Sequence, residues 1–209
     1  MKGLFITFEG NDGSGKSSVI AKAKQILEEA GYTVTLTREP GGSTIAEKIR
    51  TLILDPKNLG MDDRTEALLY AASRREHLIK TVLPALEKGH IVLCDRFLDS
   101  SLVYQGLARN IGMEEIYNLN MFAVEGKLPD LTLFVQVRPE VGLSRISLDN
   151  RELDRLELEG LSFQEKVYRG YQYLAQQFPQ RIKVINGECS KEEVCNQAIE
   201  IIMNFVKEQ

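Results

Sequence analysis

The sequence of 209 residues lacks several features that mark other classes of protein. It has three cysteines, Cys94, Cys189 and Cys195, and no C-x-x-C pair, so we expect reduced thiols in a cytoplasmic protein. No apolar run approaches the about 20 residues of a membrane-spanning helix. Residues 1–3 lead directly into the first predicted strand, so we expect no signal peptide, and we find no repeat or low-complexity tract.

The sequence also lacks an excess of positive charge. It contains 30 Asp and Glu residues against 26 Lys and Arg residues, which gives a formal net charge of −4. Proteins that bind nucleic acids through bulk charge usually carry a basic face, so we expect no nucleic-acid partner. A local basic pocket for a small phosphorylated ligand is compatible with this balance. The length suits one domain, and we expect residues 1–209 to form it.

The most informative stretch that is present is a glycine-rich loop near the start of the chain. Residues 10–17 read Gly-Asn-Asp-Gly-Ser-Gly-Lys-Ser and match the phosphate-loop pattern G-x-x-x-x-G-K-[ST] at every fixed position. A predicted strand, residues 3–8, precedes the loop, and a predicted amphipathic helix, residues 18–29, follows it. Backbone N–H groups and the helix N-terminus attract a phosphate in such a loop, and Lys16 would reach the β- and γ-phosphates. The residues predicted to bind the nucleotide are Gly10, Asn11, Asp12, Gly13, Ser14, Gly15, Lys16, Ser17 and Ser18.

Strands and helices are predicted to alternate through the rest of the chain. Further strands are expected at residues 32–37, 90–94, 131–137 and 181–185. A helix is expected to start near Ser43 or Thr44, with Glu47 in a capping box with Thr44, and to end at about Leu54. Further helices are expected at residues 63–88 with a break near Pro84, from a cap at Asp99 or Ser100, at 114–125, from Pro139, at 163–178 and at 191–207. This alternation predicts an α/β fold of the three-layer P-loop NTPase type, with a parallel sheet of about five strands and helices on both faces.

Three polar segments fall at the carboxyl ends of predicted strands, where a parallel sheet binds its ligands. They are the phosphate loop, Arg38-Glu39 and Asp95-Arg96, and we expect them to form one site. Ser17 and Asp95 would be the partners of Mg²⁺, which prefers oxygen ligands. Arg96 would bind an acceptor phosphate through its planar guanidinium group.

Asp12 and the helix residues Tyr70 and Arg74 each allow two interpretations. A carboxylate in a phosphate loop repels the donor phosphates unless it points to an acceptor hydroxyl or a metal-bound water, and otherwise Asp12 is a solvated loop residue. Tyr70 and Arg74 share a helix face and form either a platform for a nucleobase or a core aromatic beside a surface arginine.

Two further groups also leave alternatives open. Ser101, Tyr104 and Gln105 recur at helical spacing, and the amide of a glutamine can pair with the edge of a pyrimidine, although helices carry many such residues. The segment at about residues 145–157 contains Arg145, Arg151 and Arg155. It is either a lid that brings positive charge over a transferring phosphoryl group or a solvated charged helix.

Taken together, these motifs resemble the bacterial thymidylate kinase family. The segments that carry the resemblance are FEGNDGSGKS at 8–17, REPGG at 38–42, TEALLYAASRR at 65–75, DRF at 95–97, DSSLVYQG at 99–106 and PDLT at 129–132. The resemblance implies the reaction ATP + dTMP → ADP + dTDP for dTTP synthesis, with Mg²⁺, in a homodimer.

The resemblance also implies roles for individual residues. Tyr70 would stack on the base, Arg74 and Gln105 would contact thymine with Ser101 nearby, and Tyr104 would crowd the 2′ position. The remaining substrate contacts would come from Arg50 and Arg96 on the dTMP phosphate, Asp12 near the 3′-hydroxyl, and Glu39.

The family places its catalytic arginine either in the phosphate loop or in the lid. This loop has Asp12 rather than an arginine, so the chain resembles the lid type. Its catalytic arginine would be Arg151 as first choice, before Arg145 and Arg155. The other catalytic residues would be Lys16, Arg96 and Asp12.

Two other functions fit parts of the sequence. A deoxynucleoside kinase would use a hydroxyl acceptor, which leaves Arg50 and Arg96 without a phosphate to bind. A nucleotide-hydrolysing switch protein that uses GTP would usually carry an N-K-x-D motif, which is absent from the sequence. We therefore expect a monophosphate kinase.

Overall fold

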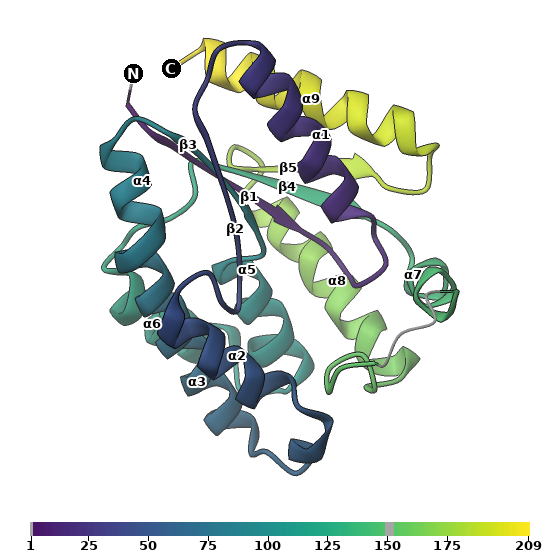
Figure 1. Ribbon diagram of the computed structural model, residues 1–209. Helices are drawn as coiled ribbons and strands as arrows, with labels where there is room; N and C mark the ends of the chain where they lie inside the picture. The colour runs from purple at the N-terminus through teal and green to yellow at the C-terminus, as the bar shows by residue number, and fades with distance from the viewer. Residues whose placement is uncertain (1, 149–152) are drawn as a thin grey trace.

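The computed structural model, which describes residues 2–148 and 153–209, is built on a five-stranded sheet of order β2-β3-β1-β4-β5 (Figure 1). All neighbouring strands run parallel. The strands are β1 (Leu4–Glu9), β2 (Val34–Arg38), β3 (Ile91–Asp95), β4 (Leu131–Gln136) and β5 (Ile182–Asn186). The predicted α/β class and the strands of the predicted sheet are confirmed, with their ends shifted by one or two residues.

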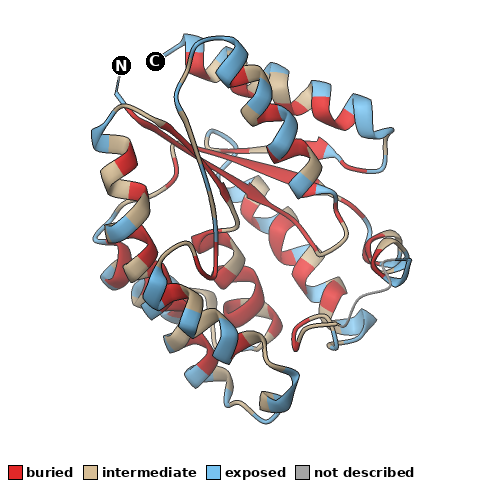
Figure 2. Ribbon diagram, viewed as in Figure 1, coloured by how far each residue is buried: buried red, intermediate tan, exposed pale blue. Residues whose placement is uncertain are grey.

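Helices cover both faces of this sheet because its central strands are apolar on both sides. In β1, Leu4, Ile6 and Phe8 pack with α1 (Lys16–Glu29) and α9 (Lys191–Lys207). Phe5 faces the opposite layer, where its ring meets Phe97 edge-on at 4.9 Å. Figure 2 shows the central strands β1, β3 and β4 as buried, the edge strand β2 as intermediate or exposed, and the outer helix faces as exposed. Continuous apolar strands of this kind are typical of parallel sheets.

The second helical layer holds most of the site-bearing elements. It contains α3 (Asp63–His77), a π-helical turn η2 (Leu78–Val82), α4 (Leu83–Glu87), α5 (Leu98–Ser101), a π-helical segment η3 (Leu102–Ala108), α6 (Met113–Val124) and α8 (Leu161–Gln177). The remaining elements are α2 (Thr44–Leu54), a 3₁₀ turn η1 (Pro56–Asn58) and α7 (Pro139–Ser147). No helix in residues 2–148 and 153–209 combines the length and the apolarity needed to cross a membrane.

The predicted caps of two helices differ from the observed ones. Of the two predicted starts of α2, Ser43 is the cap, with its hydroxyl accepting from the N–H of Ala46. The predicted Thr44–Glu47 capping box is therefore wrong, because Glu47 accepts instead from the N–H of Gly42 at 2.8 Å. Asp99 does not cap α5, because its buried carboxylate binds the Arg181 guanidinium at 2.6 and 2.8 Å.

The break predicted near Pro84 is confirmed, and its form is a widened turn. Residues 78–82 are π-helical, immediately before Pro84 in the first turn of α4. Proline has no N–H, and its ring clashes with the carbonyl four residues earlier, so a regular α-turn cannot continue through Pro84. The helix that begins at Leu98 also widens, into η3, which was not predicted from the helical spacing of its residues.

Candidate active site

The phosphate loop runs from the end of β1 into α1, as predicted. The Lys16 ammonium group donates to the carbonyl oxygens of Gly10 at 2.9 Å and Asn11 at 3.0 Å. Gly13 has φ 75°, and a Cβ there would overlap the carbonyl oxygen of Gly142 on α7. Burial, with a smaller effect from the Arg96 charge, lowers the pKa of Lys16 to about 8. The ammonium group is thus held inside the loop, at a point where an anionic ligand would stabilise its charge.

A polar depression, here called the loop cleft, lies over this loop. Its lining comprises residues 12–17, Arg38, Glu39, Arg50, Asp95, Arg96, Arg145, Ile146, Asp154 and Glu157. The cleft therefore unites the ends of β1, β2 and β3, as predicted from the three polar segments. Five side chains of the lining are cationic and five are acidic. The cationic groups, Lys16 and four arginines, suit a ligand that carries several phosphates.

Two oxygen-bearing residues of the loop cleft fit a magnesium ion. Asp95 Oδ1 is buried and has no hydrogen-bond partner among the described residues. Ser17 lines the same cleft. The described residues contain no cluster of three or more His, Cys, Asp or Glu side chains suited to a metal. Mg²⁺ does not need such a cage, because it keeps water ligands and binds through one or two protein oxygens together with substrate phosphates.

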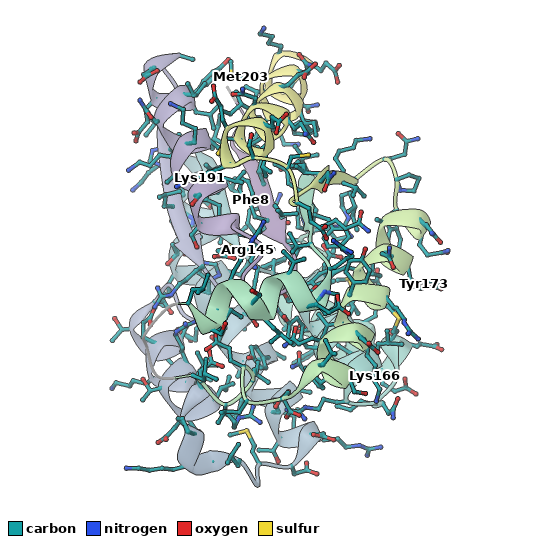
Figure 3. All side chains as sticks on the ribbon, turned by 90° about the vertical axis from the view of Figure 1, so that its right-hand side faces the viewer. Phe8, Arg145, Lys166, Tyr173, Lys191 and Met203 are labelled. Atoms are coloured by element: carbon teal, nitrogen blue, oxygen red, sulfur yellow. The ribbon has the colours of Figure 1, made fainter. Side chains whose placement is uncertain are left out.

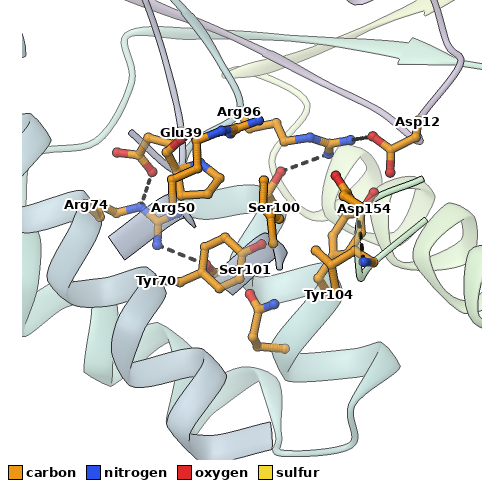
Figure 4. Close-up of a pocket in the computed structure, with 14 residues that line it drawn as sticks. Asp12, Glu39, Arg50, Tyr70, Arg74, Arg96, Ser100, Ser101, Tyr104 and Asp154 are labelled. Atoms are coloured by element: carbon orange, nitrogen blue, oxygen red, sulfur yellow. Dashed lines mark hydrogen bonds and ion pairs between the residues drawn. The ribbon is translucent and has the colours of Figure 1, made fainter. Parts of the chain in front are cut away.

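A second depression, here called the inner cavity, opens beside the loop cleft (Figure 4). Its lining includes every residue predicted to bind the substrate: Asp12, Glu39, Arg50, Tyr70, Arg74, Arg96, Ser101, Tyr104 and Gln105. The two depressions share the walls formed by Asp12, Glu39, Arg50, Arg96 and Asp154. A group held in one is therefore adjacent to a group held in the other.

Arg96 stands at the boundary of the two depressions in a constrained conformation. Its φ of 67° lies in the left-handed region, which residues other than glycine seldom adopt. Its guanidinium group donates to Asp12 Oδ1 at 2.6 Å, to the Tyr171 hydroxyl at 3.1 Å and to Ser100 Oγ at 3.2 Å. It also lies 5.1 Å from the centre of the Tyr104 ring. The guanidinium group is thus fixed before any ligand arrives.

Glu9 is connected to Arg96 through two shared hydroxyl groups. It is fully buried, and its carboxylate accepts from the Phe97 N–H at 2.8 Å, from Ser100 Oγ at 2.6 Å and from the Tyr171 hydroxyl at 2.8 Å. Ser100 and Tyr171 are the same hydroxyls that receive hydrogen bonds from Arg96. Burial, together with the nearby Asp99 charge, raises the pKa of Glu9 from 4.5 to about 7.

Arg74 occupies the far wall of the inner cavity and is almost fully buried. Its guanidinium group donates to Glu39 Oε2 at 2.7 Å and to Ser101 Oγ at 2.9 Å (Figure 4). It also donates to the Phe97 carbonyl at 2.9 Å and to Asn120. The alternative of a surface arginine is therefore wrong, since Arg74 is 1% exposed. Glu39 fixes the arginine in place and also accepts from His77 at 2.8 Å.

The three arginines predicted in the lid do not all lie at the loop cleft. Arg151 lies outside the described residues. Arg145, on α7, donates to the carbonyl oxygens of Gly13 at 3.3 Å and Gly187 at 3.1 Å, and Figure 3 shows it directed from α7 toward the end of β1. Arg155 is 2% exposed and binds the Ile53 carbonyl and Glu66, outside the loop cleft. Arg155 is therefore a packing residue in this structure, contrary to its expected place in the lid.

A third depression, here called the outer cavity, extends the loop cleft away from the inner cavity. It is lined by Ser14, Gly15, Ser18, Val19, Arg145, Gly187, Cys189, Lys191, Val194 and Cys195. Residues from α1, α7 and α9 thus meet beside the phosphate loop. Cys94 lies apart from this cavity and is buried in β3.

Sequence reasoning missed several residues that shape the site. Tyr171 reaches Arg96 from α8, 75 positions along the chain, and no local pattern marks it. Ser100 was considered only as a helix cap. Asp154 lines both the loop cleft and the inner cavity, but it follows a charged stretch in which one aspartate does not stand out.

Comparison with known proteins gives a consistent picture. The family model described as thymidylate kinase matches residues 8–198. A thymidylate kinase from Oceanobacillus iheyensis is 53% identical over 210 residues, covering 100% of this chain and 93% of the relative. One from Halalkalibacterium halodurans is 54% identical over 202 residues, covering 96% of each chain. The crystal structure of a thymidylate kinase from Ehrlichia chaffeensis superposes with a TM-score of 0.77 at 33% identity, covering 97% of this chain and 99% of that one.

The raised pKa of Glu9 predicts a pH-dependent effect of Glu9→Gln on stability. Between pH 4.5 and about 7 the folded protein retains a proton that the unfolded chain releases, so the stability of the parent protein falls as pH rises through this range. The variant has no such titration. Its free energy of unfolding relative to that of the parent should therefore rise from pH 5 to pH 8, as measured by urea denaturation. The exposed Glu200→Gln is the control, and a difference that stays constant with pH would contradict the assignment.

Proposed function

Because the chain belongs to the thymidylate kinase family and transfers the γ-phosphoryl group of ATP to dTMP, we propose that the loop cleft binds the donor phosphates and the inner cavity binds dTMP. The observation that carries this proposal is the shared wall of the two depressions, which contains Arg50, Arg96 and Asp12. Two nucleotides bound on either side of that wall would present their phosphates to each other.

The donor contacts follow from the phosphate loop. Its backbone N–H groups and the N-terminus of α1 stabilise the β-phosphate, and Lys16 exchanges its carbonyl partners for the β- and γ-phosphates. We place the adenine in the outer cavity, because Val19 and Val194 offer it apolar surface beside the loop. Arg145 lies between that cavity and the loop cleft, so it is positioned to contact the phosphate chain.

The acceptor contacts follow from the inner cavity. Tyr70 and Tyr104 provide aromatic surface for the thymine and the deoxyribose, and Arg74 and Gln105 provide polar contacts to the base. The Tyr104 hydroxyl is buried without a partner among the described residues, so it fits a polar group of the ligand. Arg50 and Arg96, at the mouth shared with the loop cleft, hold the acceptor phosphate.

The transfer itself asks the protein for positioning and charge neutralisation. An oxygen of the dTMP phosphate forms a bond to the γ-phosphorus as the bond to the β–γ bridging oxygen breaks, and ADP leaves. The acceptor oxygen is already anionic, so no general base is needed. Lys16 and Arg96 balance the negative charge, and Asp12 fixes Arg96 at 2.6 Å. We assign a further arginine contact to Arg151 or Arg145 from the lid.

Magnesium is the remaining component of the proposed reaction. Ser17 and Asp95 would hold it, the latter directly or through water, in keeping with the unpartnered Asp95 Oδ1. When bound there, the ion would supply positive charge that neutralises the phosphates of ATP.

We also propose that the chain works as one domain, in the cytoplasm and as a homodimer. The three cysteines are all free thiols, which suits a reducing compartment. The support for a dimer is an apolar groove between α3 and α6, where Leu68 is 58% exposed and Phe122 is 87% exposed. Large exposed apolar side chains that lie together mark association surfaces.

An ADP-release assay with a panel of acceptors tests the assignment of the inner cavity. With dTMP, Arg50→Ala should raise KM by about 10- to 100-fold, because a charge-assisted hydrogen bond is worth about 1.5–3 kcal/mol. The exposed Lys48→Ala on the same helix should leave KM unchanged. Thymidine should not replace dTMP as acceptor. Equal use of thymidine, or equal effects of the two variants, would contradict a phosphate-binding role for Arg50.

The lowered pKa of Lys16 predicts how ATP affinity changes with pH. Above about pH 8 the lysine of the free enzyme loses its proton, and ATP must restore that proton on binding. KM for ATP should therefore rise by up to about tenfold per pH unit between pH 8 and 9.5. KM for dTMP is the internal control, since its arginine contacts do not titrate in this range. An ATP KM that stays flat to pH 9.5 would contradict the role of Lys16.

The dimer proposal predicts a specific effect at the groove between α3 and α6. Phe122→Glu places a charge on the apolar patch and should convert the protein to a monomer in sedimentation experiments. Tyr173→Glu is the matched control, because Tyr173 is 50% exposed on α8, away from the groove. A monomeric parent protein, or a dimer that survives Phe122→Glu, would exclude this interface.

A further inference from the structure

The inner cavity contains a glutamine whose orientation is fixed from behind. Gln105, on η3, lines the cavity and is 1% exposed. Its amide nitrogen donates to Glu66 Oε1 at 2.8 Å. Glu66, on α3, is itself fully buried and does not line the cavity. Among the described residues that line the cavity, Gln105 is the one to which the Glu66 carboxylate is hydrogen-bonded.

The chemistry of this contact allows one orientation of the amide. A carboxylate only accepts hydrogen bonds, so it is the amide nitrogen of Gln105, and not the oxygen, that must face Glu66. Glu66 also binds the guanidinium groups of Arg155 and, at 3.3 Å, Arg109, so its oxygens are surrounded by donors. The side-chain oxygen of Gln105, Oε1, accepts no hydrogen bond from another described residue, and it is left to the cavity as an acceptor.

An acceptor at this point distinguishes one pyrimidine from another. Thymine and uracil carry a hydrogen at N3, so their N3–H can donate to the glutamine oxygen. Cytosine has a lone pair at N3, which would face the glutamine oxygen as a second acceptor. A buried site built to pair with one donor rejects a ligand that leaves its acceptor unpaired.

We propose that Glu66 is a specificity-determining positioning residue, which holds the Gln105 amide in the orientation that accepts dTMP and excludes dCMP. This inference rests on the proposed placement of the base in the inner cavity. It assigns no contact with substrate to Glu66 itself. It also gives a role to the buried Glu66 carboxylate, which does not line the cavity and is separated from it by the Gln105 side chain.

The variant Glu66→Gln is the natural test, but alone it would leave the buried Arg155 cation without its partner. We therefore pair two proteins, Arg155→Met and the double variant Glu66→Gln/Arg155→Met. They differ only in whether the group behind Gln105 is a carboxylate or an amide. A glutamine at position 66 can donate to the Gln105 oxygen, so the Gln105 amide is free to turn and offer its N–H group to the base.

The measurement is the ratio of kcat/KM for dTMP to kcat/KM for dCMP, with thermal unfolding of each protein recorded in parallel. Arg155→Met should keep the parent ratio. The double variant should lower that ratio by at least about tenfold, with activity toward dCMP increasing as activity toward dTMP falls.

The possible outcomes separate the inference from its premise. A ratio that is the same in the two variants, including an equal loss of both activities, would reduce Glu66 to a packing role and overturn the inference. A parent protein that does not prefer dTMP to dCMP would instead overturn the placement of the base. A lowered ratio in the double variant, from a parent that prefers dTMP, supports both.

Discussion

The site depends on three buried carboxylates that hold its functional groups in place. Glu9 binds the two hydroxyls that fix Arg96, Glu39 binds Arg74, and Glu66 binds Gln105. All three glutamates are at most 4% exposed. Burying a carboxylate is costly unless donors satisfy it, and each of these has at least two donor groups. These hydrogen bonds offset part of the cost, and in Glu9 the remainder appears as a pKa raised to about 7. The result is a cavity whose polar groups keep one arrangement before ligand binds.

Arg96 connects this rigid cavity to the phosphate loop. It follows β3 directly, and its left-handed backbone turns the side chain toward Asp12 across the carboxyl end of β1. A single guanidinium group therefore borders both nucleotide sites. This position lets it bind the acceptor phosphate and balance the charge of the transferring group. The parallel sheet makes the arrangement possible, because it brings the ends of β1 and β3 side by side.

Much of this arrangement could be predicted from the sequence, and the rest could not, for physical reasons. The glycine loop, Asp95-Arg96 and the alternation of strands and helices are local patterns, and they sufficed for the fold. The family resemblance added the substrate residues that line the inner cavity, but not Ser100 or Asp154. Contacts between distant segments leave no such pattern. Tyr171 on Arg96 and Arg155 on Glu66 join residues 75 and 89 positions apart. The Arg155 prediction failed because a charged stretch predicts exposure, whereas tertiary pairing buried this one arginine. The π-helical η3 was missed because its residues fit α-helical spacing equally well over one turn.

The central claim is that one continuous site binds both nucleotides with their phosphates facing each other across Arg96. Calorimetry with a dinucleotide in which adenosine and thymidine are joined through five phosphates tests this claim most directly. We predict one molecule bound per chain, with binding abolished by saturating ATP and equally by saturating dTMP, and weakened strongly by Arg96→Ala. Competition with only one of the two nucleotides, or two molecules bound per chain, would contradict the claim.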